Sequence, residues 1–379
     1  MLKPGFNLVH FLALIGLFLC CTALLIFNNG IIAFFLILLF FFGGRLFLRK
    51  VTGYTSGRFV IIKNAILIVY FLLAGFICNI LCTETNYYFY FDQGSTLKVI
   101  DNGSWVYIQN AHQLDTKEQY ANPNVVIQTI DIKRDQKSFL GKAINSLITQ
   151  KIQVFIFKPT NEFFLVADPN HGFTPMSVNE AFQRKKSTFL INSSFYDSLN
   201  NPLGEIIYCS KRFQSSSKST GFFNVIQGVP HVGQKTTLNG NDTQPTYACQ
   251  GHPSVIVDGQ MLPKIINLSV NKWKERRYRN LIGEKADGSI VFIASGNGGL
   301  LDVKEITQIA NLIGVKEASL FDAGVALQYA FQSQGYSYEF SAFNNDLDLG
   351  SMIDRIGMNI FGANFIQRSP IYIGVKLKE

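Results

Sequence analysis

The chain has 379 residues, 47% of them hydrophobic, and carries a formal net charge of +8. This length exceeds that of an ordinary soluble domain, and the apolar content suffices for a sizeable core and further hydrophobic segments. Part of the positive charge falls in one short loop near the N-terminus, where membrane topology and anionic lipid explain it, so no nucleic-acid partner is expected.

Three apolar segments near the N-terminus predict a helical membrane anchor. They are Leu8 to Phe27, Ile31 to Leu48 and Val60 to Cys82. Each is about as long as a helix that crosses a hydrocarbon layer of roughly 30 Å, and a buried helix of a soluble protein rarely stays apolar on all sides. For the first segment alone the alternative is a cleaved signal peptide, but no small-residue cleavage pattern follows it. We therefore expect residues 1–83 to form three transmembrane helices in a lipid bilayer.

The distribution of cations predicts the orientation of this anchor. No cation lies between the first two segments, whereas the connection to the third contains Arg45, Arg49, Lys50 and Arg58, with Lys63 just beyond. Because positively charged short loops stay in the cytoplasm, three spans leave the residues after the anchor outside. The chain is predicted to be a multi-pass membrane protein with an extracytoplasmic C-terminal domain, as in a periplasmic or cell-envelope protein.

The remainder of the chain is rich in short strands. Residues 84–123 are interpreted as a linker or edge extension, and residues 124–379 as one domain. Strands are predicted at residues 125–132, 152–159, 163–168, 187–192, 204–209, 221–228, 253–259, 289–294 and 372–377. Short helices are expected at residues 142–149 and 177–184, and surface loops at 211–220 and 233–246. The pattern indicates an α+β domain with a mixed β-sheet core and few helices.

One carboxylate stands at the end of a predicted strand. Residues 302–314 have apolar side chains at helical spacing, with Asp302 as the expected N-cap and Gly314 as the stop. A short apolar strand follows, and Asp322 lies at its end before a turn of small residues. Sheets often place their chemistry at such positions, but a lone aspartate there is more often a turn or cap residue. Other residues must support a catalytic role.

Several familiar catalytic signatures are missing from the sequence. It has no GxSxG, HExxH, paired CxxC or GxxxxGK[ST], which argues against an ordinary serine hydrolase, a zincin, a zinc ribbon and a P-loop NTPase. The five histidines show no metal-ligand spacing, so no cofactor is expected, although a divalent cation is possible. The turn Gly296 to Gly299, which contains Asn297, could bind a phosphate before the helix, but such a sequence is more often a plain strand-to-helix turn. Pairing of Cys209 with Cys249 is left open.

Six segments occur in an order that resembles a known family. They are FLINSSFYD (189–197), NPLGEII (201–207), GFFNVIQGVP (221–230), CQGHPSVIVDGQ (249–260), RNLIGEKADGSIVFIAS (279–295) and SLFDAG (319–324). Together they resemble the phosphodiester glycosidase family, which includes the lysosomal uncovering enzyme and many bacterial envelope proteins. The resemblance covers about residues 124–378 and implies the fold and the glycosidase activity of that family.

The resemblance also implies a set of site residues. It suggests that Asp322 stabilises positive charge at the anomeric carbon or acts as acid or base, and that Arg279 holds the departing phosphate. The implied substrate-binding residues are Asn192, Tyr196, Gly204, Gln250 and Gly324. Asn297, from the glycine-rich turn, is added to this set. The second carboxylate of an acid/base pair remains open among Glu205, Asp258 and Glu284.

Departures from the family pattern leave two functional hypotheses open. Ala323 and the residues Val325 to Gln328 replace a glycine and hydroxyl-rich residues of the family, and Ser193 with Ser194 replace small residues of the first turn. The first hypothesis is a membrane-anchored extracytoplasmic hydrolase that cleaves a sugar-1-phosphodiester in an envelope glycan or glycoconjugate. The alternative is a degenerate, non-catalytic glycan-binding or envelope-assembly protein of the same fold.

Overall fold

The computed structural model describes residues 96–378 except 136–149, 198, 200, 216–220, 235–243, 268–269 and 346–366. These residues belong to one compact unit, formed by Tyr88–Asp346 and Ile366–Glu379. The three expected membrane segments and the expected helix at 142–149 lie outside the described residues. Within the described ranges, no helix combines the length and the apolar character needed to cross a bilayer.

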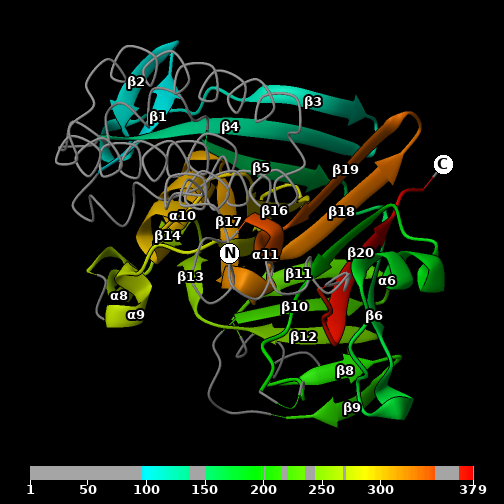
Figure 1. Cartoon of the computed structure of the whole chain (residues 1–379). Helices are drawn as coiled ribbons and strands as arrows, with labels where there is room; N and C mark the ends of the chain where they lie inside the picture. Colours follow the sequence, from blue (N-terminus) through cyan, green and yellow to red (C-terminus); the bar gives the residue numbers. More distant parts are fainter. Residues whose placement is uncertain are drawn as a thin grey trace, which may run out of the picture. The chain divides into compact units, whose positions relative to one another are not determined.

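The largest sheet runs in the order β14-β13-β17-β15-β16-β5-β4-β1-β2, with β3 also paired to β4 (Figure 1). Its strands are β1 (Thr96–Asp101), β2 (Ser104–Tyr107), β3 (Lys117–Asn122), β4 (Val125–Asp135), β5 (Gln150–Phe157), β13 (Ser254–Val257), β14 (Gln260–Met261), β15 (Asn280–Lys285), β16 (Ile290–Ser295) and β17 (Val315–Leu320). Residues interpreted as a linker or edge extension thus contribute β1, β2 and β3 at one end of this sheet.

Two five-stranded sheets complete the fold. The second sheet has the order β11-β10-β12-β8-β9 and the third the order β19-β18-β7-β20-β6. The second contains β8 (Ile206–Tyr208), β9 (Lys211–Gln214), β10 (Gly221–Ile226), β11 (Val229–Gly233) and β12 (Tyr247–Gly251). The third contains β6 (Glu162–Ala167), β7 (Phe189–Asn192), β18 (Gln328–Ser333), β19 (Tyr336–Ser341) and β20 (Ile371–Lys376).

Helices are short and few in the described part of the chain. The α-helices are α6 (Val178–Lys185), α8 (Pro263–Ile266), α9 (Asn271–Lys274), α10 (Val303–Leu312) and α11 (Ala342–Asn345), and short 3₁₀ turns occur at Ile108–Asn110, Pro169–His171 and Gly324–Ala326. The predictions for α6 and α10 are confirmed. Ser177 and Asp302 each accept a hydrogen bond from a backbone N–H three residues on and complete a capping box.

The central strands of the large sheet are buried on both faces. In β16, Phe292 faces a core shared by all three sheets, where its ring centroid lies 4.9 Å from that of Phe189 in β7. Its neighbours Val291 and Ile293 face a second core, which α10 covers with Ile306 and other apolar side chains (Figure 1). Alternating side chains of one strand therefore fill two cores, which leaves the strand ends as the places for polar chemistry.

Two sequence expectations need correction. The sheets are not mixed, because every strand pair among the described residues is antiparallel. The segment read as strand, helix, strand does run from β16 through α10 to β17, and those two strands are parallel, but β15 lies between them. The expected loop at 211–220 is also partly wrong, since Lys211–Gln214 forms β9 and pairs with β8.

Candidate active site

The ends of β7 and β17 meet at Asn192 and Asp322. The backbone N–H of Asp322 donates to the carbonyl of Ser193 at 2.9 Å. The side-chain amide of Asn192 donates to the Asp322 carbonyl at 3.3 Å and makes a longer contact of 3.5 Å with its carboxylate Oδ2. Asn192 is fully buried, and its Oδ1 accepts from the backbone N–H of Gln328 at 2.9 Å. Three chain segments therefore converge on one carboxylate.

The turn after Asp322 depends on a glycine. Gly324 has a φ of +71°, a left-handed conformation that other residues adopt only with strain. Its N–H donates to the carbonyl of Tyr278 at 2.9 Å, and the N–H of Leu327 donates back to the Gly324 carbonyl. Gly324 thus lies beside the aspartate, as the resemblance implied, and it shapes the turn between β17 and β18.

Burial makes Asp322 a weak acid. The residue retains some exposed surface, but protein surrounds its carboxyl group, and this desolvation raises the pKa to about 7. Hydrogen bonds from the Ala323 backbone and from Asn192 oppose the rise only in part. Burial, helped by the nearby Asp322 carboxylate, raises the pKa of Tyr196 to about 12, so this hydroxyl remains a hydrogen-bond donor. A carboxyl with a pKa near 7 can both give and take a proton at neutral pH.

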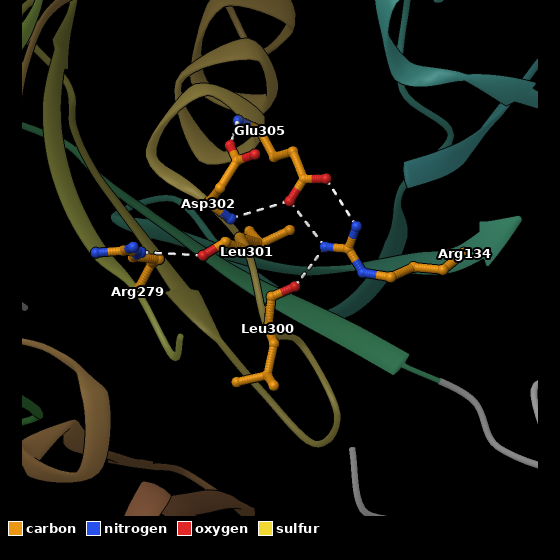
Figure 2. Close-up of polar contacts among 6 residues, drawn as sticks. All are labelled: Arg134, Arg279, Leu300, Leu301, Asp302 and Glu305. Carbon is orange, nitrogen blue, oxygen red and sulfur yellow. Dashed lines mark hydrogen bonds and ion pairs between the residues drawn. The ribbon is translucent and has the colours of Figure 1, made fainter. Parts of the chain in front are cut away.

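Arg279 does not meet Asp322. Its Nε donates to the carbonyl of Leu301 at 3.0 Å and its Nη2 to that of Glu275 at 2.5 Å, as Figure 2 shows for Leu301. Burial and the nearby Arg277 lower its pKa to about 10, and Asp322 has no part in that shift. Figure 2 also shows Arg134 bound to Leu300 and Glu305, so two arginines hold consecutive carbonyls ahead of α10. Arg279, which was predicted to hold the phosphate, thus binds backbone carbonyls of its own chain in the structure.

Gly204 and Gln250 form a second pair beside the site. Gly204 has a φ of +93°, and a Cβ there would lie 3.0 Å from the side chain of Gln250. Gln250 is buried, and its Oε1 accepts from the Glu205 backbone N–H at 2.8 Å. The end of β12 approaches β17 closely, because a Cβ on Gly251 would lie 2.3 Å from the Leu320 carbonyl. Gln250 therefore holds the Gly204 turn near the end of β17.

The remaining predicted residues have other partners. The carbonyl of Asn297 accepts from the Lys151 backbone, and the glycine-rich turn around it lies against β5. The three alternative second carboxylates also face elsewhere. Glu205 pairs with Arg212 at 2.8 Å, Asp258 lies exposed in the turn between β13 and β14, and Glu284 accepts from the backbone N–H of Val232 at 2.9 Å.

The structure adds two polar residues that sequence reasoning missed. Asn280 is fully buried at the start of β15, and its side-chain amide donates to the carbonyls of Asn192 at 2.8 Å and Asp322 at 3.4 Å. Gln328 begins β18 and is also buried. Successive residues of a strand face opposite sides, so only one of Arg279 and Asn280 can face Asp322. This alternation was the sequence signal that could have pointed to Asn280 in place of Arg279.

No metal or disulfide site supports this cluster in the described ranges. No group of three or more His, Cys, Asp or Glu side chains there could hold a metal ion. Cys209 and Cys249 are both free, the first exposed and the second buried. Burial raises the pKa of the Cys249 thiol to about 12, although the Ser193 and Ser194 hydroxyls beside it favour the thiolate. The thiol is therefore a packing group rather than a nucleophile.

Residues 185–349 match the family model described as phosphodiester glycosidase, NAGPA. This part of the chain is therefore similar to a phosphodiester glycosidase domain. The match includes β7, the end of β17 and all the residues around Asp322. No curated protein matches the chain.

Solved structures share the fold at low sequence identity. The catalytic domain of zebrafish N-acetylglucosamine-1-phosphodiester alpha-N-acetylglucosaminidase, auto-inhibited by its pro-peptide, is 11% identical with a TM-score of 0.51, over 70% of this chain and 88% of that one. A hypothetical protein from Synechocystis is 12% identical with a TM-score of 0.45, over 75% of this chain and 68% of that one. The zebrafish structure indicates a common fold for the described domain.

Proposed function

We propose that this chain is a membrane-anchored hydrolase outside the cytoplasm that cleaves a sugar-1-phosphodiester bond in an envelope glycan or glycoconjugate. The observation that carries the proposal is Asp322, a buried carboxyl that stands beside Asn192 and has a pKa of about 7. The similarity of the surrounding residues to a phosphodiester glycosidase domain supports the reaction class. The glycosidase activity printed for the zebrafish relative is of the same class.

The proposed reaction needs one group that gives and then takes a proton. Protonated Asp322 donates its proton to the bridging oxygen as the bond from that oxygen to the anomeric carbon breaks, and the phosphate leaves with the electron pair. Water then adds to the anomeric carbon and gives its proton to the Asp322 carboxylate, which restores the acid. A single carboxyl with a pKa near neutral can serve both steps, so no second carboxylate is required.

Neighbouring side chains have supporting roles in this proposal. Asn192 orients the carboxyl through its amide, and the Tyr196 hydroxyl, which stays protonated, donates to a phosphate or sugar oxygen. Gly204 and Gln250 shape the turn that follows Tyr196. Arg279 acts on the fold rather than on the substrate.

A glycan-binding protein without activity is the second candidate. The observation in its favour is that the Arg279 guanidinium, implied to hold the phosphate, binds the Leu301 and Glu275 carbonyls instead. In that case the same amide side chains would bind sugar hydroxyls, and Asp322 would contribute affinity without turnover.

One experiment separates these two functions. The full-length chain is assayed for release of reducing sugar from a panel of sugar-1-phosphodiesters, as wild type, Asp322→Asn and Asp258→Asn. Asp258 is the matched control, because it is an exposed carboxylate in a turn away from Asp322. We expect turnover that falls about 100-fold or more in Asp322→Asn and is unchanged in Asp258→Asn. Glycan binding without any release by the wild type would favour the binding protein.

A further inference from the structure

Asn280 connects the two strand ends that form the candidate site. Its side-chain amide donates to the carbonyl of Asn192 at the end of β7 and to that of Asp322 just beyond β17. Its own backbone carbonyl accepts from the N–H of Phe321 at 2.9 Å. Side chain and backbone of this one residue therefore bind both segments that hold the carboxyl.

We propose that Asn280 is a positioning residue for Asp322. It keeps the Asn192 amide beside the carboxyl and excludes water from that side of it. The inference rests on the proposed function for its catalytic meaning, but the contact between the two residues can be tested without any substrate.

The burial of Asn280 supports a specific role. The residue has no exposed surface, and its Oδ1 has no hydrogen-bond partner among the described residues. A buried polar atom without a partner destabilises the folded chain, so an apolar residue of similar size would serve packing better. The hydrogen bonds of the NH₂ group account for an asparagine at this position, since both carbonyls that it binds belong to the segments around Asp322.

Among the described residues, no charged side chain contributes to the pKa of Asp322. Tyr196 is the titratable neighbour whose pKa responds to the Asp322 carboxylate. Arg279 just before β15 binds the Leu301 carbonyl, Glu205 before β8 pairs with Arg212, and Glu284 binds the Val232 backbone N–H. The charge state of Asp322 thus depends on burial, on the Ala323 backbone and on the Asn192 amide. Asn280 acts on it indirectly, because its amide binds the carbonyls of Asn192 and Asp322.

The test measures the titration of Asp322 through thermal stability. Both tryptophans of the chain, Trp105 and Trp273, lie in the described unit, so the fluorescence of the full-length chain reports the unfolding of this unit. The Tm of Asp322→Asn minus that of the wild type is recorded across pH. This difference rises between the unfolded-state and folded-state pKa values, and its alkaline midpoint, the pH at which the slope of the rise has fallen to half, marks the pKa of Asp322 in the folded chain. In the Asn280→Ala background we expect this midpoint to fall by at least about one pH unit, because water reaches the carboxyl. We also expect kcat/KM to fall at least about tenfold, with its alkaline limb moved in the same direction.

Asn224→Ala is the matched control. Asn224 is a buried asparagine of β10 whose Oδ1 also has no partner among the described residues, and no bond joins it to Asp322. We expect this variant to lower Tm without moving the midpoint. If Asn280→Ala does not fold, Asn280→Ser takes its place, since its hydroxyl is too short to reach both carbonyls.

The outcomes separate this inference from the proposed function. An unchanged midpoint in a folded Asn280 variant overturns the role of Asn280, whatever the activity of the wild type. A shifted midpoint in a chain that hydrolyses no sugar phosphodiester supports the contact and overturns only the proposed reaction.

Discussion

The raised pKa of Asp322 comes from burial rather than from a charged neighbour. An acid whose protonated form starts the reaction loses activity as pH rises through its pKa. With a pKa of about 7, we expect kcat/KM to fall about tenfold for each pH unit above that value. In Asp322→Asn the residual rate should lose this alkaline limb. Initial rates of sugar release across pH provide the measurement, and a limb that persists in the variant would assign the titration to another group.

The same carboxyl should make folding depend on pH. Its pKa of about 7 in the folded chain is above the ordinary value of 3.8, so the folded state holds the proton more tightly and loses stability as pH rises from about 4 to about 7. Each pH unit between the two pKa values is worth about 1.4 kcal/mol, so the free energy of unfolding falls by at most about 4 kcal/mol. Asp322→Asn is expected to be more stable than the wild type at pH 8 and similar at pH 4. Urea unfolding followed by tryptophan fluorescence tests both values.

At the scale of the element, a buried ion pair fixes α10 to the large sheet. Arg134 of β4 is 1% exposed, and its two terminal nitrogens each lie 2.7 Å from an oxygen of Glu305. Removing one member of such a pair leaves a buried charge, at a cost of about 3–5 kcal/mol. We expect Arg134→Met to show this loss in urea unfolding, whereas Arg134→Met with Glu305→Leu recovers most of it. A double variant no more stable than the single one would show that the contact itself is required.

Arg279 belongs to the same part of the structure. Because its guanidinium binds the carbonyls of Leu301 and Glu275, its replacement should destabilise the start of α10 and leave the binding of the substrate phosphate unchanged. We expect Arg279→Lys to lower the free energy of unfolding by about 1–3 kcal/mol and to leave KM and the pH profile near the wild-type values. A large rise in KM at unchanged stability would instead show that Arg279 binds the substrate.

Local patterns predicted α10 well because every signal for it is contained in a short stretch. Asp302 and Glu305 form the capping box, and the apolar spacing marks the buried face. The partner of Glu305 could not be predicted, since Arg134 lies 171 residues away in the sequence. The site shows the same division. Asp322 stood out as a carboxylate at a strand end, but the choice between Arg279 and Asn280 depends on which face of β15 turns toward it.

For the whole molecule, sequence order predicted the many short strands but not how they pair. Loops of a few residues join neighbours such as β10 and β11, which makes them antiparallel. The strands β16 and β17 follow each other along the chain through α10, yet β15, from earlier in the chain, lies between them in the sheet. Pairing between strands distant in sequence depends on both cores being filled at once. A short stretch of sequence contains no information about that packing.

The location of this domain is the remaining prediction, and it depends on residues 1–83. If the three apolar segments cross the membrane with Arg45, Arg49, Lys50 and Arg58 inside, the domain that follows them lies outside the cytoplasm. A reporter active only outside, fused after Glu379, should then give signal, and one active only in the cytoplasm should give none. Replacing those four cations with Gln is the matched test, because it removes the charge bias without shortening any apolar segment. We expect the outside signal to fall and a cytoplasmic signal to appear in that variant. Cytoplasmic signal from the unaltered chain would contradict the three-span anchor and, with it, a substrate in the envelope.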